Sequence, residues 1–135
     1  MQIQLWNDCK DGKVEEVRKL LQNEQVSINW QHYNYSTTPF YVACQYGHID
    51  IVKLLLNDNQ VNINSGNNNG WTPFHIACKN GHIDIIKLLL GDKHISIRKE
   101  NEDGKTAIDI AKEDNHSEIV KLIKEVDTSI DFKTI

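Results

Sequence analysis

The sequence predicts an all-α fold in which four short helix-turn-helix units stack in a row, joined by β-hairpin-like loops. The triplet Thr-Pro-Phe at residues 38–40 returns at residues 72–74, which is 34 positions later. Residues 38–64 and 72–98 are identical at 16 of 27 positions, where unrelated segments would match at about one position in twenty. Helix-start and helix-stop residues also recur at this period, so each unit is expected to hold one pair of helices.

The first helix of each internal unit is bounded by residues that begin and end helices. Thr38 and Thr72 are good N-caps, because a hydroxyl accepts a hydrogen bond from an unpaired backbone N–H, and a proline follows each of them at the first helical position. Gly47 and Gly81 follow at positions where a left-handed residue would close the helix. The sequence therefore predicts helices that begin near these threonines and end near these glycines.

The second helix of each internal unit is predicted from its apolar face. Asp50 and Asp84 fall in the first turn, where a negative charge favours the helix dipole. Broad apolar faces follow them, formed by Ile51, Val52, Leu54 and Leu55, and by Ile85, Ile86, Leu88 and Leu89. A short alternating stretch at residues 61–64 and turn residues at 67–70 then predict a hairpin-like finger before the next unit.

These motifs resemble those of the ankyrin-repeat family. The third unit reads Thr72-Pro73-Phe74-His75-Ile76-Ala77, then Gly81-His82, where the family pattern is Thr-Pro-Leu-His-x-Ala and Gly-His. The asparagine-rich style is similar to that of ankyrin arrays in unicellular eukaryotes. The resemblance implies an ankyrin-repeat α-solenoid over residues 1–126, with units at 1–32, 33–66, 67–100 and 101–126 and a tail at 127–135.

Two departures from the family pattern concern contacts between units. The family histidine is present as His75, and the resemblance implies that its ring and the threonine hydroxyl link neighbouring repeats. Tyr41 and Asp109 occupy the matching positions in the other units. The first finger is one residue longer than the second and carries Ser36 where Gly70 stands in the second. The shape of the first finger is therefore the part of the fold that the repeat predicts least.

The two terminal units are expected to act as caps with one polar outer face. In the last unit, Lys112 and Asn115 replace the repeated cysteine and glycine. At the N-terminus, apolar residues are expected to cover the inner side of the first unit, with polar ones facing water: Ile3, Leu5 and Trp6 inside, and Gln2, Gln4, Asn7 and Asp8 outside. Apolar side chains at 130, 132 and 135 leave two predictions open for the tail, packing or mobility.

Composition narrows the classes of function. The 135 residues carry a formal net charge of −4, with −2 on each side of residue 67 (5 minus 7 and 10 minus 12), so no basic half is present to bind a nucleic-acid backbone. Residues 1–6 lack the basic region and the long apolar run expected of a signal peptide, and no later run approaches the length of a membrane span. Three cysteines, an odd number, favour reduced thiols. We expect a monomer in the cytoplasm or nucleus, with no nucleic-acid, membrane or small-molecule partner.

The alternative class is a small metal-binding protein or enzyme that uses histidine and cysteine. Cys44 and Cys78 recur at one repeat position where the family has a small residue, which favours a buried structural role. His48, His82 and His116 likewise recur at one position, whereas His94 is ambiguous. Because there is no Cys-x-x-Cys, His-x-x-x-His or phosphate-binding loop, no catalytic residue, metal site or cofactor is predicted.

An uncharged aromatic region is the strongest functional signal. Tyr33, Tyr35, Tyr41 and Tyr46 fall within residues 25–49, which contain no charged residue. In the family, partners contact the fingertips and the exposed end of each first helix. Those positions correspond here to His32, Asn34, Tyr35, Gln45, Tyr46, Asn68, Asn69, Trp71, Lys79, Asn80, Glu102, Asp103, Lys105 and Glu113.

The candidates change in character along the chain. Tyr35, Tyr46 and Trp71 are expected to form an aromatic cluster near the middle of a concave surface, followed by a net acidic end. We therefore expect a non-enzymatic protein-protein interaction module whose partner segment has an apolar anchor and a basic flank.

Overall fold

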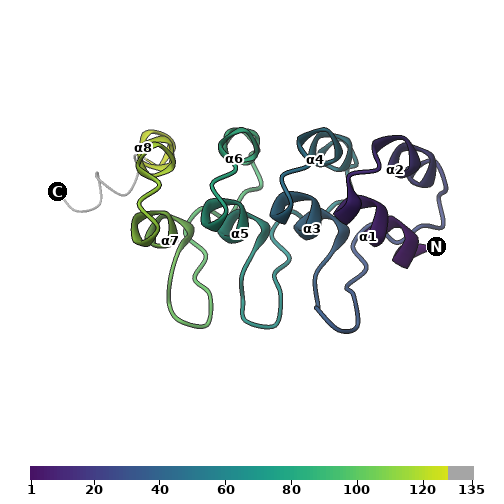
Figure 1. The fold of residues 1–135 in the computed structure, drawn as a ribbon, viewed down its shortest axis with the longest axis horizontal. Coiled ribbons are helices and arrows are strands. Elements are labelled where there is room, and N and C mark those ends of the chain that lie inside the picture. Colours follow the sequence, from purple (N-terminus) through teal and green to yellow (C-terminus); the bar gives the residue numbers. More distant parts are fainter. Residues whose placement is uncertain (128–135) are drawn as a thin grey trace.

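The computed structural model describes residues 1–127, which form eight helices and no strand. The first helices of the four pairs lie side by side in one row, and the second helices form a parallel row above them in Figure 1. Three fingers project from the first row on the side away from the second helices (Figure 1). The helices are α1 Gln2–Asp11, α2 Val14–Leu21, α3 Pro39–Gln45, α4 Ile49–Leu56, α5 Pro73–Lys79, α6 Ile83–Leu90, α7 Ala107–Glu113 and α8 Ser117–Val126. The expected unit boundaries at 32, 66 and 100 fall in the finger segments.

The first helices begin as the sequence predicts. The Thr38 hydroxyl accepts a hydrogen bond from the Tyr41 N–H at 3.0 Å, and the Thr72 hydroxyl accepts one from the His75 N–H at 3.2 Å. Thr106 caps α7 in the same way, although no proline follows it. Each threonine thus satisfies one backbone donor that the helix itself cannot pair.

The second helices bury most of the predicted faces, although Leu54 and Leu88 are only half-buried. Ile51, Val52 and Leu55 of α4 are fully buried, and so are their equivalents Ile86 and Leu89 of α6. These side chains form one continuous core that runs from α1 to α8. Each helix pair is too small to bury its own apolar surface, so neighbouring units supply the missing contacts.

A histidine and a glycine join each unit to the one before it. In each case, Nε2 donates to a carbonyl near the end of the preceding first helix: His48 to Lys10 at 2.8 Å, His82 to Gln45 at 2.9 Å and His116 to Lys79 at 3.1 Å. The ring lies against a glycine of the preceding unit. At Gly47, a Cβ would lie 2.8 Å from Cε1 of His82, and φ is +76°. This position needs glycine both for its backbone conformation and for space.

The N-terminal cap differs in part from the expectation. Leu5 and Trp6 are buried as predicted, but Ile3 is 39% exposed and Asp8 only 2% exposed, so both of those predictions were wrong. Asp8 precedes Cys9 as Ala43 precedes Cys44, and therefore falls on the buried face of the repeat. Its carboxylate accepts a hydrogen bond from the Gln4 amide at 2.9 Å.

The C-terminal end of the described chain is held by an ion pair. Asp127, the first residue of the predicted tail, accepts hydrogen bonds from Nε and Nη2 of Arg98 at 2.9 and 3.0 Å. The predictions for the apolar side chains at 130, 132 and 135 lie outside the described residues. Within residues 1–127, every helix is too short or too polar to cross a lipid bilayer.

Gly47→Ala is expected to lower the free energy of unfolding by about 2–4 kcal/mol, since it combines a left-handed backbone penalty of about 1–2 kcal/mol with a clash against His82. In a His82→Ala background the clash is gone, so Gly47→Ala should cost only the backbone part. Urea denaturation of the four proteins measures this coupling.

Gly91→Ala is the matched control, because Gly91 has φ −81° and its nearest neighbouring atom would lie 3.5 Å from an added Cβ. This substitution should change stability by less than about 1 kcal/mol. An equal loss for Gly47→Ala in both backgrounds would contradict the proposed contact.

Candidate functional site

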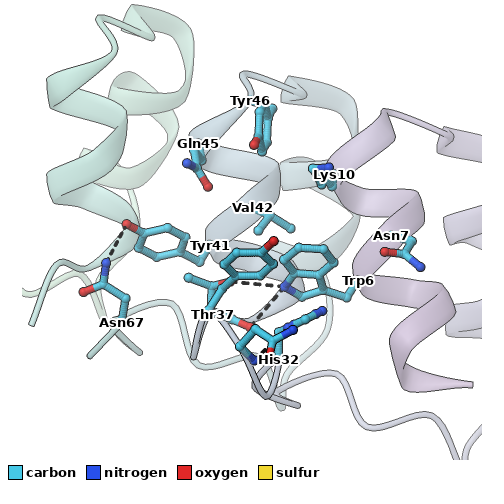
Figure 2. Close-up of a pocket in the computed structure, with 12 residues that line it drawn as sticks. Trp6, Asn7, Lys10, His32, Thr37, Tyr41, Val42, Gln45, Tyr46 and Asn67 are labelled. Carbon is cyan, nitrogen blue, oxygen red and sulfur yellow. Dashed lines mark hydrogen bonds between the residues drawn. The ribbon is translucent and has the colours of Figure 1, made fainter. Parts of the chain in front are cut away.

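A groove of about 570 Å³ lies between the first and second units, on the side of the first helices and the first finger (Figure 2). Aromatic and neutral polar side chains dominate its lining. The lining residues are Trp6, Asn7, Lys10, His32, Asn34, Tyr35, Thr37, Tyr41, Val42, Gln45, Tyr46 and Asn67. Five of the predicted partner-binding residues therefore meet in one groove, although Trp71 is not among them.

His32 shapes the first finger. Its N–H donates to the Thr37 carbonyl at 2.9 Å, and its Nδ1 accepts from the Asn34 N–H at 3.1 Å. Asn67 makes the same pair of contacts in the second finger, to the Trp71 carbonyl and from the Asn69 N–H. The histidine thus replaces a turn asparagine.

The extra residue of the first finger lies between His32 and Thr37. Ser36 there adopts φ +57°, in the conformation that Gly70 adopts in the second finger at +76°. A side chain in this region carries strain that glycine avoids, so the longer first finger closes at a cost of the order of 1–2 kcal/mol.

Stacked rings form the wall of the groove nearest the N-terminus. The rings of Trp6 and Tyr35 are parallel within 4°, with centroids 5.7 Å apart, and His32 lies 4.3 Å from Trp6. Trp6 is buried and Tyr35 is 60% exposed. His32 is only 9% exposed, so the expected contact of its side chain with a partner is restricted by the rings around it.

The other end of the groove is formed by the ends of α1 and α3. Tyr46 is 48% exposed, and the Lys10 ammonium lies 5.9 Å from its ring centroid. The Gln45 carbonyl is occupied by hydrogen bonds from Asn80 and His82, which leaves the Gln45 side chain as the part that lines the groove.

Trp6, Asn7 and Lys10 were missed by the sequence reasoning. The repeat alignment could have identified Lys10, because it stands 35 positions before the predicted site residue Gln45, as Cys9 stands before Cys44.

A hydrogen bond to the next finger recurs at one position of the first helix. His75 Nε2 donates to the Lys105 carbonyl at 3.0 Å, and Trp6 Nε1 donates to the Thr37 carbonyl at 3.1 Å from the equivalent position. The expectation that the His75 ring links neighbouring repeats is thus confirmed. Its Nδ1 also lies 2.7 Å from the Thr72 hydroxyl and accepts from the Thr72 N–H at 3.1 Å. Trp6 provides the same link between units with an unrelated side chain.

Tyr41 makes a different contact at this position. Its hydroxyl accepts a hydrogen bond from the Asn67 side-chain amide at 3.4 Å, and burial raises the pKa of Tyr41 to about 12. Asn101 is the equivalent of Asn67 in the third finger, but His75 has no hydroxyl to accept its hydrogen bond. The side-chain nitrogen of Asn101 is therefore buried without a hydrogen-bond partner. Asp109 completes the cap of Thr106 instead, with its carboxylate 3.0 Å from the Thr106 N–H.

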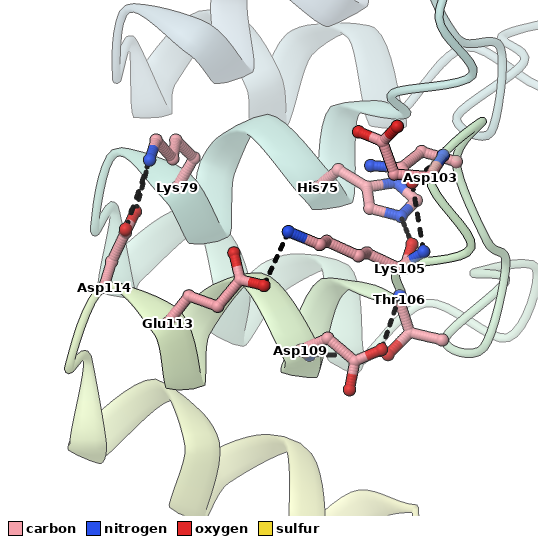
Figure 3. A network of polar contacts seen from close by, with 9 residues as sticks. His75, Lys79, Asp103, Lys105, Thr106, Asp109, Glu113 and Asp114 are labelled. Atoms are coloured by element: carbon pink, nitrogen blue, oxygen red, sulfur yellow. Dashed lines mark hydrogen bonds and ion pairs between the residues drawn. The ribbon is translucent and has the colours of Figure 1, made fainter.

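Ion pairs occupy part of the predicted acidic end (Figure 3). Lys79 pairs with Asp114 at 3.0 Å, and Lys105 pairs with Glu113 at 2.7 Å. Glu102 and Asp103 at the third fingertip are exposed, and neither side chain takes part in an ion pair within the described chain. The negative charge that remains on this face is therefore concentrated at the fingertip.

The remaining predicted residues lie in the second finger, at the start of the third unit. Asn68 and Asn69 are exposed at the second fingertip, and the Asn69 carbonyl accepts from the Glu102 N–H at 3.0 Å, which ties the second fingertip to the third. Trp71 is half-buried, with its ring 6.0 Å from that of His75. These side chains lie beyond the groove.

The thiols offer little chemistry. Cys9, Cys44 and Cys78 are buried and free, and burial raises the pKa of each thiol, to about 12 for Cys78. A thiol held in its neutral form is a poor nucleophile and a poor metal ligand. Among residues 1–127, no three His, Cys, Asp or Glu side chains are grouped so that they could hold a metal ion.

Comparison with known proteins agrees with the geometry. Family models described as "Ankyrin repeats (3 copies)" and "Ankyrin repeats (many copies)" match residues 59–134 and 20–76, respectively. The chain therefore belongs to the ankyrin-repeat family, whose members generally act as protein-protein interaction modules and are typically not enzymes. A search of curated proteins found no match to the chain.

His75 should make stability depend on pH. Burial lowers the pKa of His75, and the Lys99 charge lowers it further, although the carbonyl contacts act in the opposite direction. Because the folded pKa lies below the unfolded value near 6.5, the stabilisation is fully present above that value and is lost as pH falls below it. His75→Gln should remove a slope of up to about 1.4 kcal/mol per pH unit as the pH falls below about 6.5.

Urea unfolding at a series of pH values measures this slope. His94→Gln is the control, since His94 is exposed and its ring makes no hydrogen bond with the described residues. The account of His75 fails if the slopes of wild type and His75→Gln coincide.

Proposed function

We propose that this chain is a monomeric, non-enzymatic binding module. Its concave surface of fingertips and first helices recognises a partner protein. The supporting observation is the groove between the first two units, where Tyr35 and Tyr46 are 60% and 48% exposed around a buried floor at Val42. Exposed aromatic rings on a rigid support favour binding, because few rotamers are lost when they are covered.

The proposed contact surface extends from this groove along the fingers. Trp71 and the asparagines at 68 and 69 form its middle, before the start of α5, and Lys79 and Asn80 lie at the opposite end of that helix. The fingertip residues Glu102 and Asp103 form the far end. A partner segment with an apolar anchor in the groove and a basic flank at this fingertip would match both parts.

Three of the candidate residues have a modified role in this proposal. Lys105 and Glu113 already neutralise one another at 2.7 Å, so they contribute little net charge to a partner. His32 supports the Tyr35 ring at 4.8 Å and contributes mainly through that support.

Tyr35→Ala and Tyr46→Ala are each expected to weaken partner binding by about 1–3 kcal/mol. Stability should change by less than about 1 kcal/mol, since neither ring is part of the buried core. The partner is first isolated by a pull-down from native cell extract, and its affinity for each variant is then measured by calorimetry. A triple variant that adds Trp71→Ala should lose the partner.

Tyr33→Ala is the matched control, because Tyr33 is 75% exposed in the same finger but does not line the groove. Its affinity for the partner should stay within about twofold of wild type. If all four variants bind as wild type does, the proposed surface is wrong.

A further inference from the structure

The groove between the first two units has an uneven distribution of charge. Lys10 is the only lysine, arginine, aspartate or glutamate among its lining residues. The adjoining finger and α3 add none, because residues 25–49 contain no charged residue. The groove therefore has one permanent positive charge and no carboxylate on its wall.

Lys10 has no partner for this charge within residues 1–127. Its ammonium forms no ion pair there and lies over the Tyr46 ring at 5.9 Å. Asp8 is near in sequence, but its carboxylate is buried and hydrogen-bonded to Gln4. The backbone carbonyl of Lys10 accepts the hydrogen bond from His48, and the ammonium is not needed for that contact.

Neutral polar groups accompany this charge. The side chains of Asn7, Asn34 and Gln45 and the hydroxyls of Tyr35 and Tyr46 line the groove and make no hydrogen bond with the described residues. Donors such as amide N–H and tyrosine O–H groups can all bond to a carboxylate oxygen. The groove thus offers an apolar aromatic wall beside several donors and one cation.

A partner that covers Lys10 removes water from its ammonium. An apolar or basic segment would leave that charge uncompensated, which is unfavourable in a partly enclosed site. A carboxylate restores the lost interaction and, in a surrounding of low polarity, gains more from the attraction than it would in water.

We propose that the segment bound in this groove is acidic: an extended peptide of the partner protein in which an aromatic side chain lies next to an aspartate or glutamate. The ring packs on Tyr35 and Tyr46, and the carboxylate pairs with Lys10. This inference rests on the proposed function and specifies the partner further. If the partner also reaches the third fingertip, its acidic part binds in the groove and its basic part binds beside Glu102 and Asp103.

Three blocked tetrapeptides test the inference, with the sequences Ser-Trp-Glu-Ser, Ser-Trp-Gln-Ser and Ser-Trp-Lys-Ser. Each is titrated into ¹⁵N-labelled full chain, and the amide shifts of groove residues are followed by NMR. The glutamate peptide should bind about fivefold more tightly than the glutamine peptide, as one partly exposed ion pair allows, and the lysine peptide should bind most weakly. The preference should shrink from 20 mM to 500 mM salt.

Lys10→Gln should make the glutamate and glutamine peptides bind equally, and the fold should be retained because the Lys10 carbonyl remains. Lys13→Gln is the matched control, since Lys13 is exposed three residues away and does not line the groove. It should leave the order of the peptides unchanged.

Equal binding of the three peptides, a preference that survives Lys10→Gln, or no shift in the groove with any peptide would overturn the acidic segment. None of these results would contradict the binding module itself. That proposal is tested separately by the loss of the partner in Tyr35→Ala and Tyr46→Ala, which does not depend on Lys10.

Discussion

The structure depends on the contact between each helix pair and the next one. Apolar faces meet across every junction, and the histidine that follows each turn donates to a carbonyl of the preceding helix at 2.8–3.1 Å. That approach is possible because the residue beneath the ring is glycine, as at Gly47. A repeat that is too small to fold alone is thus fixed in position by its neighbour, and the first helices and fingers form a continuous rigid surface.

The candidate site arises where the repeat departs from its own pattern. In the second finger a glycine and an asparagine close the turn, whereas the first finger uses Ser36 and His32 and has one more residue. The longer finger places Tyr35 parallel to Trp6, and Trp6 links the units as His75 does further along. The same substitutions that alter the local turn therefore supply the aromatic wall of the groove.

The net charge of each part of the surface depends on which charged residues form ion pairs as well as on which residues are present. Lys79 and Lys105 are used in ion pairs with Asp114 and Glu113, so four charged residues contribute almost no net field. Lys10 remains unpaired within residues 1–127 at one end, and the third fingertip keeps its acidic residues at the other. The chain is acidic overall, yet its groove carries a positive charge, and the proposal of a partner with charges of both signs rests on this contrast.

The sequence by itself determined the family, the repeat period, the caps at Thr38 and Thr72 and the buried faces of the second helices, because these depend on spacing within one unit. The tertiary structure alone decided what depends on contacts between units. It buried Asp8 and His32, left Trp71 outside the groove, and brought Lys10 and Trp6 into it. A side chain's exposure in a stacked array is set by the neighbouring unit, about 34 residues away, and no local pattern records how closely that neighbour packs.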